Sequence, residues 1–415
     1  MKKLFSIVLA ALMVFALVAC GGGTDASSVL TDAAGNYVQG ITDTQVVIGN
    51  SAATSGPYAP VGVPFLAGIQ AYLDKVNSEG GIDGREIIFN HITDDEFDPA
   101  KGKAALANLV EDEKVFAIVG HFGTPVVAAT VEDLKEYGIP AVYFATGIGQ
   151  LYAENATTNA EGYNIFPVQP IYRTEGRIMV AYATGRFDAQ KIGIIYTNDD
   201  AGMDLYTGAM AQIEAIGGLE VVAEQVTAGS ADVSAAVTSI KNADVDFIIV
   251  ASIQGTMPTI VKELAAQSVN KDCVTTYVNV SSAMSEAVVT DIQGKFDVYG
   301  LGWVDQSVED VAVYQQWAPE EYAMNAYAMT GWIAAHFFCE GLRRLVGQEV
   351  TWASYMAALE DGPIQNPFGG KIDFSNGQRM GTQEMNLSRV VVPSDNWPAG
   401  WELVAPMASI ETLLA

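Results

Sequence analysis

Beyond residue 44, short runs of β-branched and apolar residues alternate with longer stretches whose apolar positions recur at a helical period. The short runs predict strands at residues 46–50, 86–91, 115–119, 141–144, 191–197, 219–223, 247–251 and 275–278. The longer stretches predict helices at residues 61–78, 99–111, 126–137, 175–186, 204–216, 233–241, 257–267 and 323–346. Because strands and helices alternate with short links, this pattern favours parallel sheets covered by helices on both faces.

The alternation falls into two series, at residues 45–168 and 170–302, each of a size typical of one doubly wound domain. The predicted fold class is therefore α/β, with two doubly wound parallel-sheet lobes. Ligands of such sheets bind beyond the carboxyl ends of the strands, where loops meet helix N-termini. With two lobes, we expect the ligand to lie in the cleft between them.

The first nineteen residues have the pattern of an export signal. Lys2 and Lys3 precede an apolar run at residues 4–19 that ends at Cys20. A transmembrane helix is the alternative interpretation, but this run has 16 residues, and about 20 are needed to cross a bilayer. Residues 21–44 are rich in Gly, Thr, Ser and Asp, a composition typical of a flexible tether.

Composition narrows the classes of function. The 415 residues include 21 Lys and Arg against 49 Asp and Glu, a formal net charge of −28. Such a surface repels the phosphates of nucleic acids and anionic lipid headgroups, so we expect no nucleic-acid partner and no membrane attachment through a basic patch. Hydrophobic residues make up 50% of the chain, which is long enough for sizeable cores.

Few residues suggest catalysis or metal binding. The chain has three His, far apart at positions 91, 121 and 336, and three Cys without a CxxC pair. It also lacks the Gly-rich and Ser-elbow motifs of common enzymes. We therefore expect no enzymatic activity, no cofactor and no metal. We expect Cys273 and Cys339 to be free thiols, although pairing outside the cell is the alternative.

The end of the apolar run, Leu17-Val18-Ala19-Cys20, resembles the lipobox of bacterial lipoproteins. This resemblance implies cleavage before Cys20 and lipidation of its thiol. Residues 1–19 would then be a signal peptide and residues 20–44 a lipid-anchored tether. The mature protein would stand outside the cytoplasm, attached to the cell membrane only through its lipid anchor.

A series of motifs follows in a characteristic order. The motifs are Val47-Ile48-Gly49, Ser55-Gly56-Pro57, Asn77-Ser78-Glu79-Gly80-Gly81-Ile82-Asp83-Gly84-Arg85, Asp94-Asp95, Asp98-Pro99, Val119-Gly120, Ile139-Pro140 and Ile194-Ile195-Tyr196. Together they resemble the leucine/isoleucine/valine-binding family of ABC-transporter solute receptors. The resemblance implies a type I periplasmic-binding-protein fold with three crossover segments. It assigns lobe 1 to residues 45–168 and 303–378, and lobe 2 to residues 169–302 and 379–415.

The same resemblance implies a function. We expect an extracellular solute-binding lipoprotein of an ABC importer, which captures a small amino acid or a hydrophobic or aromatic carboxylate between its lobes. Its partners would be this small molecule and the ABC permease subunits, and the protein itself would be a monomer. A ligand-sensing receptor of the same fold, not coupled to transport, is the alternative.

One candidate binding position can be argued from the residues themselves. A strand ending at Val119 leads through a Gly-rich loop to Thr124 and Pro125, which suit the start of a helix. Free N–H groups and positive potential at a helix start suit a carboxylate, although a purely structural cap is the alternative. The resemblance implies that the Thr124 hydroxyl and the loop of Phe144, Ala145 and Thr146 bind the carboxylate.

Other candidates would line the cleft. They are Tyr58, Tyr172, Asn198, Asp199, Asn279 and Ser281, for which ordinary packing or turn formation is the alternative. Family members that bind leucine-like amino acids carry a Tyr where Ala201 stands, and an acid in the stretch that matches residues 278–281. No acid occupies that stretch here, and a buried ammonium needs a partner. Gly123-Thr124-Pro125 instead resembles the branch associated with hydrophobic or aromatic carboxylates.

Overall fold

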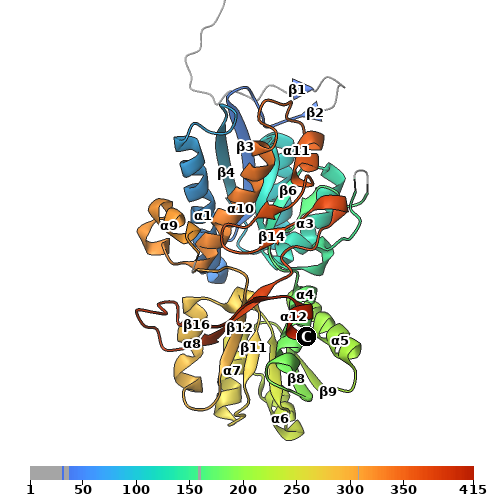
Figure 1. The fold of residues 1–415 in the computed structure, drawn as a ribbon, viewed down its shortest axis with the longest axis vertical. Helices are drawn as coiled ribbons and strands as arrows, with labels where there is room; N and C mark the ends of the chain where they lie inside the picture. The colour runs from blue at the N-terminus through green and yellow to red at the C-terminus, as the bar shows by residue number, and fades with distance from the viewer. Residues whose placement is uncertain (1–29, 32–36, 158–159, 307) are drawn as a thin grey trace, which may run out of the picture.

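The computed structural model describes residues 30–31, 37–157, 160–306 and 308–415, which form two α/β lobes arranged end to end (Figure 1). The predicted signal peptide, the Cys20 lipidation site and most of the predicted tether lie outside these residues. Within the described part of the chain, no helix combines the length and the apolar character needed to cross a membrane.

Lobe 1 is built on a parallel five-stranded sheet with the order β4-β3-β5-β6-β7. Its strands are β3 (Gln45–Ala52), β4 (Glu86–Asp94), β5 (Ala117–Phe122), β6 (Ala141–Ala145) and β7 (Ile165–Phe166). The helices are α1 (Ala59–Ser78), α2 (Pro99–Ala107), α3 (Thr124–Tyr137), α9 (Asp310–Trp317), α10 (Ala326–Arg343) and α11 (Trp352–Leu359). Every residue of β5 is buried, as expected for a central parallel strand covered on both faces.

Helix α10 comes late in the sequence but packs against α1 in lobe 1 (Figure 1). The two backbones touch because glycines stand at the crossing. A Cβ atom at Gly331 would lie 1.9 Å from the carbonyl oxygen of Phe65, and one at Gly68 would lie 1.8 Å from that of Ala328. The small hairpins β1 (Leu30–Thr31) with β2 (Tyr37–Val38), and β13 (Ile364–Gln365) with β14 (Lys371–Ile372), lie outside the main sheets.

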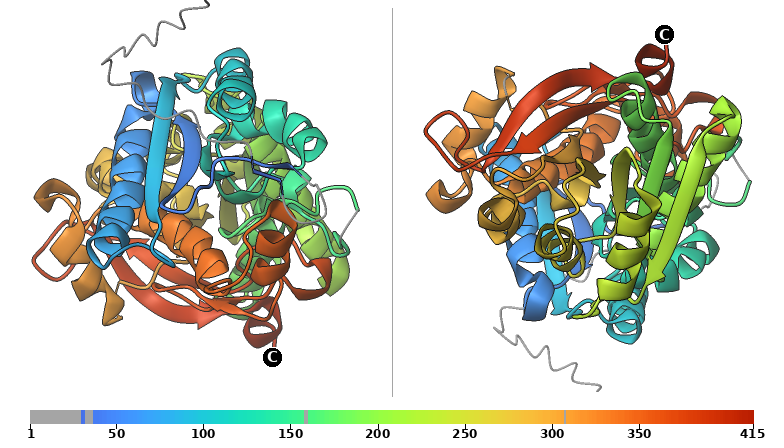
Figure 2. Two further views of the ribbon diagram at one scale, coloured as in Figure 1. Left: turned by 90° about the horizontal axis from the view of Figure 1, so that it is seen from above. Right: turned by 90° about the horizontal axis from the view of Figure 1, so that it is seen from below.

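Lobe 2 holds a seven-stranded sheet with the order β16-β15-β12-β11-β10-β8-β9. Its strands are β8 (Lys191–Thr197), β9 (Glu220–Val226), β10 (Phe247–Ala251), β11 (Cys273–Thr275), β12 (Val298–Gly302), β15 (Met385–Val390) and β16 (Trp401–Ala408). The helices are α4 (Tyr172–Gly185), α5 (Asp200–Ile216), α6 (Ser234–Ala243), α7 (Met257–Ala266), α8 (Ser282–Ile292) and α12 (Ile410–Leu413). Strands β15 and β16 are antiparallel and form one edge (Figure 2), an addition that the parallel pattern did not predict.

The chain passes between the lobes after Phe166, after Gly302 and before Met385. One predicted strand of lobe 2 is wrong in position, because β11 ends at Thr275 and the chain turns at Tyr277–Asn279. The buried carboxyl group of Glu175 explains this turn. It accepts hydrogen bonds from the Thr276 hydroxyl and the Tyr277 N–H, both at 2.7 Å, and so draws the backbone away from the strand direction.

Candidate functional site

A cavity of about 630 Å³ lies between the two lobes. Its walls come from loops that follow β3, β5 and β6 in lobe 1 and β10 and β11 in lobe 2, together with the connections between the lobes. These loops lie at the carboxyl ends of parallel strands, where ligands of open α/β sheets bind. The volume lies within the range of roughly 300–1,000 Å³ that is typical of pockets that bury a small organic molecule.

Aromatic side chains dominate the walls of this cavity. They are Tyr58, Phe65, Phe97, Phe122, Tyr172, Tyr277, Trp303, Tyr327, Trp397 and Trp401. Among the described lining residues only Asp305 is charged, and its side chain or backbone already has an interaction within the protein. A cavity with large apolar surfaces and a few polar groups suits a ligand with an apolar body.

The lobe 1 wall centres on a pair of stacked rings. Tyr58 and Phe97 have ring centroids 3.8 Å apart and planes only 12° from parallel. Phe97 also packs on the turn before α3, because a Cβ atom at Gly123 would lie 2.7 Å from its ring. The aromatic surface therefore lies directly beside the start of α3.

Buried hydrogen bonding holds Phe97 in this position. Glu96 and Phe97 both have positive φ, 52° and 66°, a conformation that is unfavourable for residues with side chains. The Asp95 carboxylate is buried and accepts a hydrogen bond of 2.8 Å from the Phe97 N–H. Burial raises the pKa of Asp95 to about 6, although this hydrogen bond favours the ionised form.

The start of α3 leaves backbone donors without a partner among the described side chains. Gly123 occupies the N-cap position with a φ of 92°, and no described side chain caps the helix. The Val127 N–H donates to the Gly123 carbonyl and Pro125 has no N–H, so the N–H groups of Thr124 and Val126 remain at the open end. These groups and the positive end of the helix dipole favour a carboxylate.

Three hydroxyl groups gather beside this helix start. The Oγ1 atoms of Thr124 and Thr146 are 2.8 Å apart. The Tyr172 hydroxyl interacts with both threonines, and burial raises the pKa of Tyr172 to about 12. Because hydroxyls can donate to an anion as well as to each other, the cluster can reorient toward a bound carboxylate.

The crossover side of the cavity contains a buried polar chain. Tyr143 donates to Gln169 Oε1 at 2.8 Å, and Gln169 Nε2 donates to the Tyr277 hydroxyl at 2.9 Å. Tyr277 in turn donates to the Pro170 carbonyl at 3.2 Å. These bonds connect the strand ends of lobe 1 to the first turn after β11, and so fix the rings of Tyr143 and Tyr277 in place.

Contacts across the cavity rim hold the lobes together. The Tyr327 hydroxyl on α10 donates to the Val278 carbonyl of lobe 2 at 3.0 Å. Within lobe 2, Gln254 Nε2 donates to the same oxygen at 2.7 Å and so fixes its position. A Cβ atom at Gly255 of lobe 2 would lie 3.5 Å from the Tyr58 hydroxyl of lobe 1. The structure therefore describes a conformation in which the lobes approach each other around the cavity.

The cavity brings together several residues that the sequence singled out. Tyr58, Thr124, Ala145, Tyr172 and Ser281 line it. Two others of the lobe 1 set lie behind the lining. Thr146 contacts the lining residues Thr124 and Tyr172 from behind, and Phe144 is fully buried in the core of lobe 1.

The remaining candidates of lobe 2 do not line the cavity. Asn198 Oδ1 accepts from the Ala228 N–H, and Asp199 caps α5 by accepting from the Gly202 N–H at 2.9 Å. Asn279 Nδ2 donates to the Ser252 carbonyl at 2.8 Å. Asp199 lies close enough to Tyr58 to add to the effect of burial, which raises the pKa of that hydroxyl.

Sequence reasoning missed several lining residues, including Phe97, Gln169, Gln254, Trp303 and Tyr327. One signal was available, because Trp303 directly follows β12 and Gln254 follows β10 by three residues. Residues that follow a parallel strand lie at its carboxyl end, where ligands bind. Tyr327 offered no such signal, because it lies in the first turn of a helix that joins lobe 1 from far along the chain.

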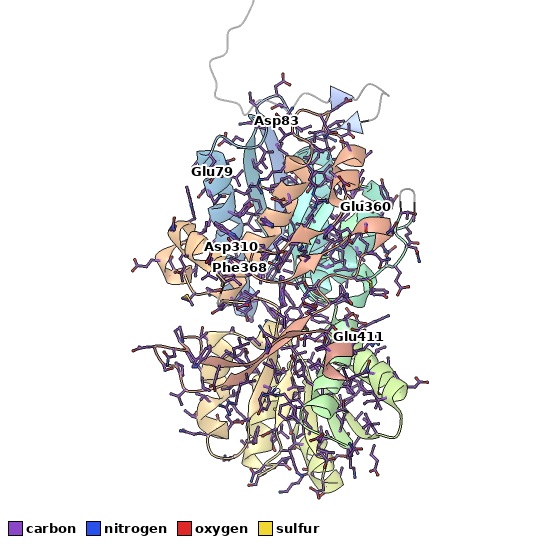
Figure 3. The ribbon with its side chains drawn as sticks, in the orientation of Figure 1. Glu79, Asp83, Asp310, Glu360, Phe368 and Glu411 are labelled. Atoms are coloured by element: carbon purple, nitrogen blue, oxygen red, sulfur yellow. The ribbon has the colours of Figure 1, made fainter. Side chains whose placement is uncertain are left out.

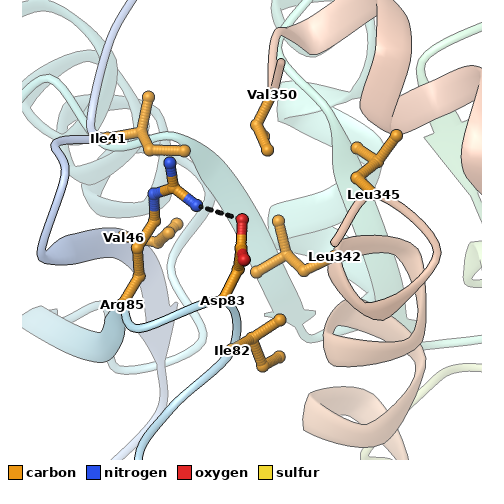
Figure 4. Close-up of a pocket in the computed structure, with 8 residues that line it drawn as sticks. All are labelled: Ile41, Val46, Ile82, Asp83, Arg85, Leu342, Leu345 and Val350. Carbon is orange, nitrogen blue, oxygen red and sulfur yellow. Dashed lines mark hydrogen bonds and ion pairs between the residues drawn. The ribbon is translucent and has the colours of Figure 1, made fainter. Parts of the chain in front are cut away.

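A second hollow, of about 10 Å³, lies at the end of lobe 1 that faces away from lobe 2 (Figure 4). Asp83 marks this end of the molecule in Figure 3. Arg85 Nη1 is 3.1 Å from Asp83 Oδ2, and Arg85 Nε donates to the Thr42 carbonyl. The Gly80–Arg85 motif therefore closes a structural turn, and the hollow has room for about one water molecule.

The described residues show no metal-ligand cluster and no disulfide bond. They contain no group of His, Cys, Asp and Glu side chains arranged to hold a metal ion. His121 is buried and its Nε2 lies 2.7 Å from Thr130 Oγ1, while burial lowers the pKa of His121 to about 4. Cys273 and Cys339 are both buried, and neither is bonded to another described cysteine.

Two sheet-based lobes with a cavity at their strand ends define a ligand-binding protein of the two-lobed class. The model of the periplasmic binding protein family matches residues 45–396, and the chain belongs to this family. This confirms the family that the motifs indicated, together with the predicted fold class. Proteins of this family bind solutes and are not enzymes, which confirms the prediction that the chain is not an enzyme.

Similar proteins agree with this family. "Leu/Ile/Val-binding protein homolog 1" of Brucella suis biovar 1 is 25% identical over 288 residues, which cover 68% of this chain and 75% of the relative. The fatty acid ABC transporter substrate-binding protein from Thermomonospora curvata has a TM-score of 0.76 at 17% identity, covering 93% of this chain and 96% of that one. An ABC transporter solute-binding protein from R. palustris, in complex with benzoate, has a TM-score of 0.71 at 20% identity. The match covers 89% of this chain and 99% of that one.

Proposed function

We propose that this chain is the solute-binding lipoprotein of an ABC importer, and that its ligand is a hydrophobic or aromatic carboxylate. One observation carries the proposal, the uncapped start of α3 with Thr124 beside an aromatic cavity. The helix start supplies donors for a carboxylate, and the rings supply apolar surface for the rest of the ligand. Cys20 would anchor the protein to the outer face of the membrane.

The lining argues against an amino acid as the ligand. The first turns of α3 and α8, which contribute to the two walls, contain no acidic residue to hold an α-ammonium. Asp305 is the one charged lining residue among those described, and it already has an interaction in the protein. A buried ammonium without a partner costs several kcal/mol, so a ligand without this group fits better.

Two similar structures are named for ligands of this class, whereas a third, from Thermus thermophilus, has bound valine. Benzoate, bound to the R. palustris protein, and a fatty acid, named for the T. curvata protein, are both carboxylates with apolar bodies. Closure would follow from contact with both lobes, since a ligand shifts the balance toward the closed form only by binding that form more tightly. The closed, loaded receptor would then deliver the ligand to the permease subunits.

A thermal-shift screen of the mature protein tests the proposal. The panel is branched-chain amino acids, aromatic carboxylates, the matching amides and fatty acids. We expect apolar carboxylates to raise the melting temperature and their amides to have little effect, because the α3 site recognises the anion. Asp305→Asn should leave carboxylate affinity within about twofold of wild type. Stabilisation by amino acids alone, with loss of that effect in Asp305→Asn, would contradict the proposal.

A further inference from the structure

Helix α8 begins in the lobe 2 wall of the same cavity, and its N-cap residue does not cap it. Ser281 has the extended backbone of an N-cap residue, with φ of −149° and ψ of 161°, but its side chain makes no capping hydrogen bond. A serine in this position ordinarily accepts a bond from the second or third N–H of the helix. Here both the hydroxyl and the helix donors are left for another acceptor.

The Ser281 hydroxyl points to a ligand independently of the helix end. The residue is only 7% exposed and lines the cavity. Its Oγ lies near the Tyr327 hydroxyl, where burial raises the pKa of Tyr327 and Ser281 opposes that rise. The Ser281 Oγ nevertheless makes no hydrogen bond to a described atom. A buried hydroxyl without a full partner costs about 1–3 kcal/mol, which a bound acceptor would recover.

The backbone donors at this helix end are also unused. The N–H groups of Met284 and Ser285 both donate to the Ser281 carbonyl, at 3.2 and 3.1 Å. The N–H groups of Ser282 and Ala283 therefore remain at the open end of the helix. Ser282, Ala283 and Met284 all line the cavity, and the first turn contains no acid.

A second contact fixes the geometry of this turn. Trp401 Nε1 donates to the Ser281 carbonyl at 2.8 Å, and the Trp401 ring packs where a Cβ atom at Gly300 would lie, 2.7 Å away. The helix start is thus held against β12 and β16 of the lobe 2 sheet. Preorganised donors of this kind bind an acceptor without the entropic cost of ordering the site.

We infer that the start of α8, with the Ser281 hydroxyl, is a second acceptor-binding subsite, so that the ligand carries an oxygen acceptor in addition to the carboxylate held by α3. The inference rests on the proposed function. The acceptor is a carbonyl or a second carboxylate, because both accept hydrogen bonds from N–H and hydroxyl donors. The rings of Tyr172, Tyr277 and Trp303, with successive centroids 5.9 and 6.5 Å apart, supply apolar surface in the same cavity.

Three para-substituted benzoates of matched shape test this inference by calorimetry. The substituents are isopropyl, acetyl and carboxylate, and the same three groups on 3-phenylpropanoate provide a longer spacing. We expect the acetyl or carboxylate ligand to bind at least tenfold more tightly than the isopropyl ligand. Preference for acetyl would identify a carbonyl as the acceptor, and preference for the carboxylate would identify an anion.

Two variants assign this preference to α8. Ser282→Pro removes one N–H, and proline is tolerated in the first turn after an extended residue such as Ser281. Ser281→Ala removes the hydroxyl. Each variant should reduce the preference for the acetyl or carboxylate ligand over the isopropyl ligand at least threefold. The affinity for the isopropyl ligand should stay within twofold of the wild-type value. Thr290→Ala changes an exposed side chain on the same helix that does not line the cavity, so it is the control and should behave as wild type.

Two results separate failure of this inference from failure of the proposed function. If the three benzoates bind with equal affinity, or if folded Ser282→Pro and Ser281→Ala keep the full preference, the subsite at α8 is refuted and the carboxylate site at α3 stands. If neither these ligands nor any carboxylate of the thermal-shift panel binds, the proposed function is refuted and the inference falls with it.

Discussion

At the scale of single residues, Glu175 shows how one buried carboxyl shapes the cavity. Its two oxygens hold the Thr276 hydroxyl and the Tyr277 N–H, and this places the Tyr277 ring in the wall. The carboxyl is completely buried, and burial raises the pKa of Glu175 to about 8, outweighing the hydrogen bonds that favour the ionised form. Near neutral pH, therefore, folding holds a proton that the unfolded chain releases.

The stability of the protein should consequently fall as the pH rises. Between pH 4.5, the ordinary pKa of this side chain, and about 8, the folded value, the unfolded state binds fewer protons than the native state. Glu175→Gln keeps an acceptor for the Tyr277 N–H, places an amide donor beside the Thr276 hydroxyl, which can accept as well as donate, and does not titrate. The melting temperatures of wild type and Glu175→Gln should be measured at pH 5, 7 and 8.5. As the pH rises, the melting temperature of the wild type should fall more than that of the variant.

The exposed Glu79 provides the control for this measurement. Glu79→Gln should leave the pH dependence of unfolding unchanged, because Glu79 forms only a surface ion pair with Lys75. Parallel curves for wild type and Glu175→Gln would show that Glu175 is not protonated in the native state.

At the scale of elements, the crossing of α1 and α10 joins the C-terminal part of the chain to lobe 1. Gly68 and Gly331 bring the helix backbones into contact. Gly331 lies five residues after Ala326, the start of the helix that also presents Tyr327 to lobe 2. The depth of this crossing therefore sets the position of one wall of the cavity.

Gly331→Ala should destabilise the protein strongly. The new methyl group would overlap backbone atoms of α1, since its carbon would lie 1.9 Å from the Phe65 carbonyl oxygen. Overpacking of this kind costs about 1–3 kcal/mol or more, which denaturant unfolding measures directly. Gln70→Ala changes an exposed side chain on α1 and should stay within about 0.5 kcal/mol. Equal stability of the two variants would contradict the close crossing.

The elements also show how far the sequence predicts this fold. Strands β5, β8 and β10 were predicted because their apolar runs are buried on both faces, a local signal. The end of β11 was not predicted, because the chain turns there toward Glu175, a residue about 100 positions earlier. In the same way, Thr124 follows from a local helix start, whereas Tyr327 enters the cavity only because α10 packs on lobe 1.

At the scale of the whole molecule, the lobes meet through contacts that the protein makes by itself. At the rim, the Tyr327 hydroxyl on α10 donates to the Val278 carbonyl of lobe 2. On the crossover side, the Gly149 N–H of lobe 1 donates to Asp204 of lobe 2 at 2.5 Å. These bonds stabilise the closed arrangement before any ligand contributes.

Tyr327→Phe should shift the ligand-free protein toward an open form. One net hydrogen bond contributes about 0.5–1.5 kcal/mol, which corresponds to a change of roughly two- to twelvefold in the open-to-closed ratio. Small-angle scattering of the ligand-free variant should show a larger radius of gyration than wild type. Tyr196→Phe alters a ring that stacks on Tyr206 and does not line the cavity, so it should scatter as wild type does. No difference between the variants would remove this role from Tyr327.

The carboxylate site at the start of α3 can be tested directly by calorimetric titration with an aromatic carboxylate that the wild type binds. The affinities to compare are those of wild type and of the double variant Thr124→Ala and Thr146→Ala. Hydrogen bonds to a charged group contribute about 1.5–3 kcal/mol each, so the double variant should bind at least tenfold more weakly. Thr238→Ala, an exposed threonine on α6, should bind as wild type does. An affinity unchanged in the folded double variant would contradict a carboxylate site at the start of α3.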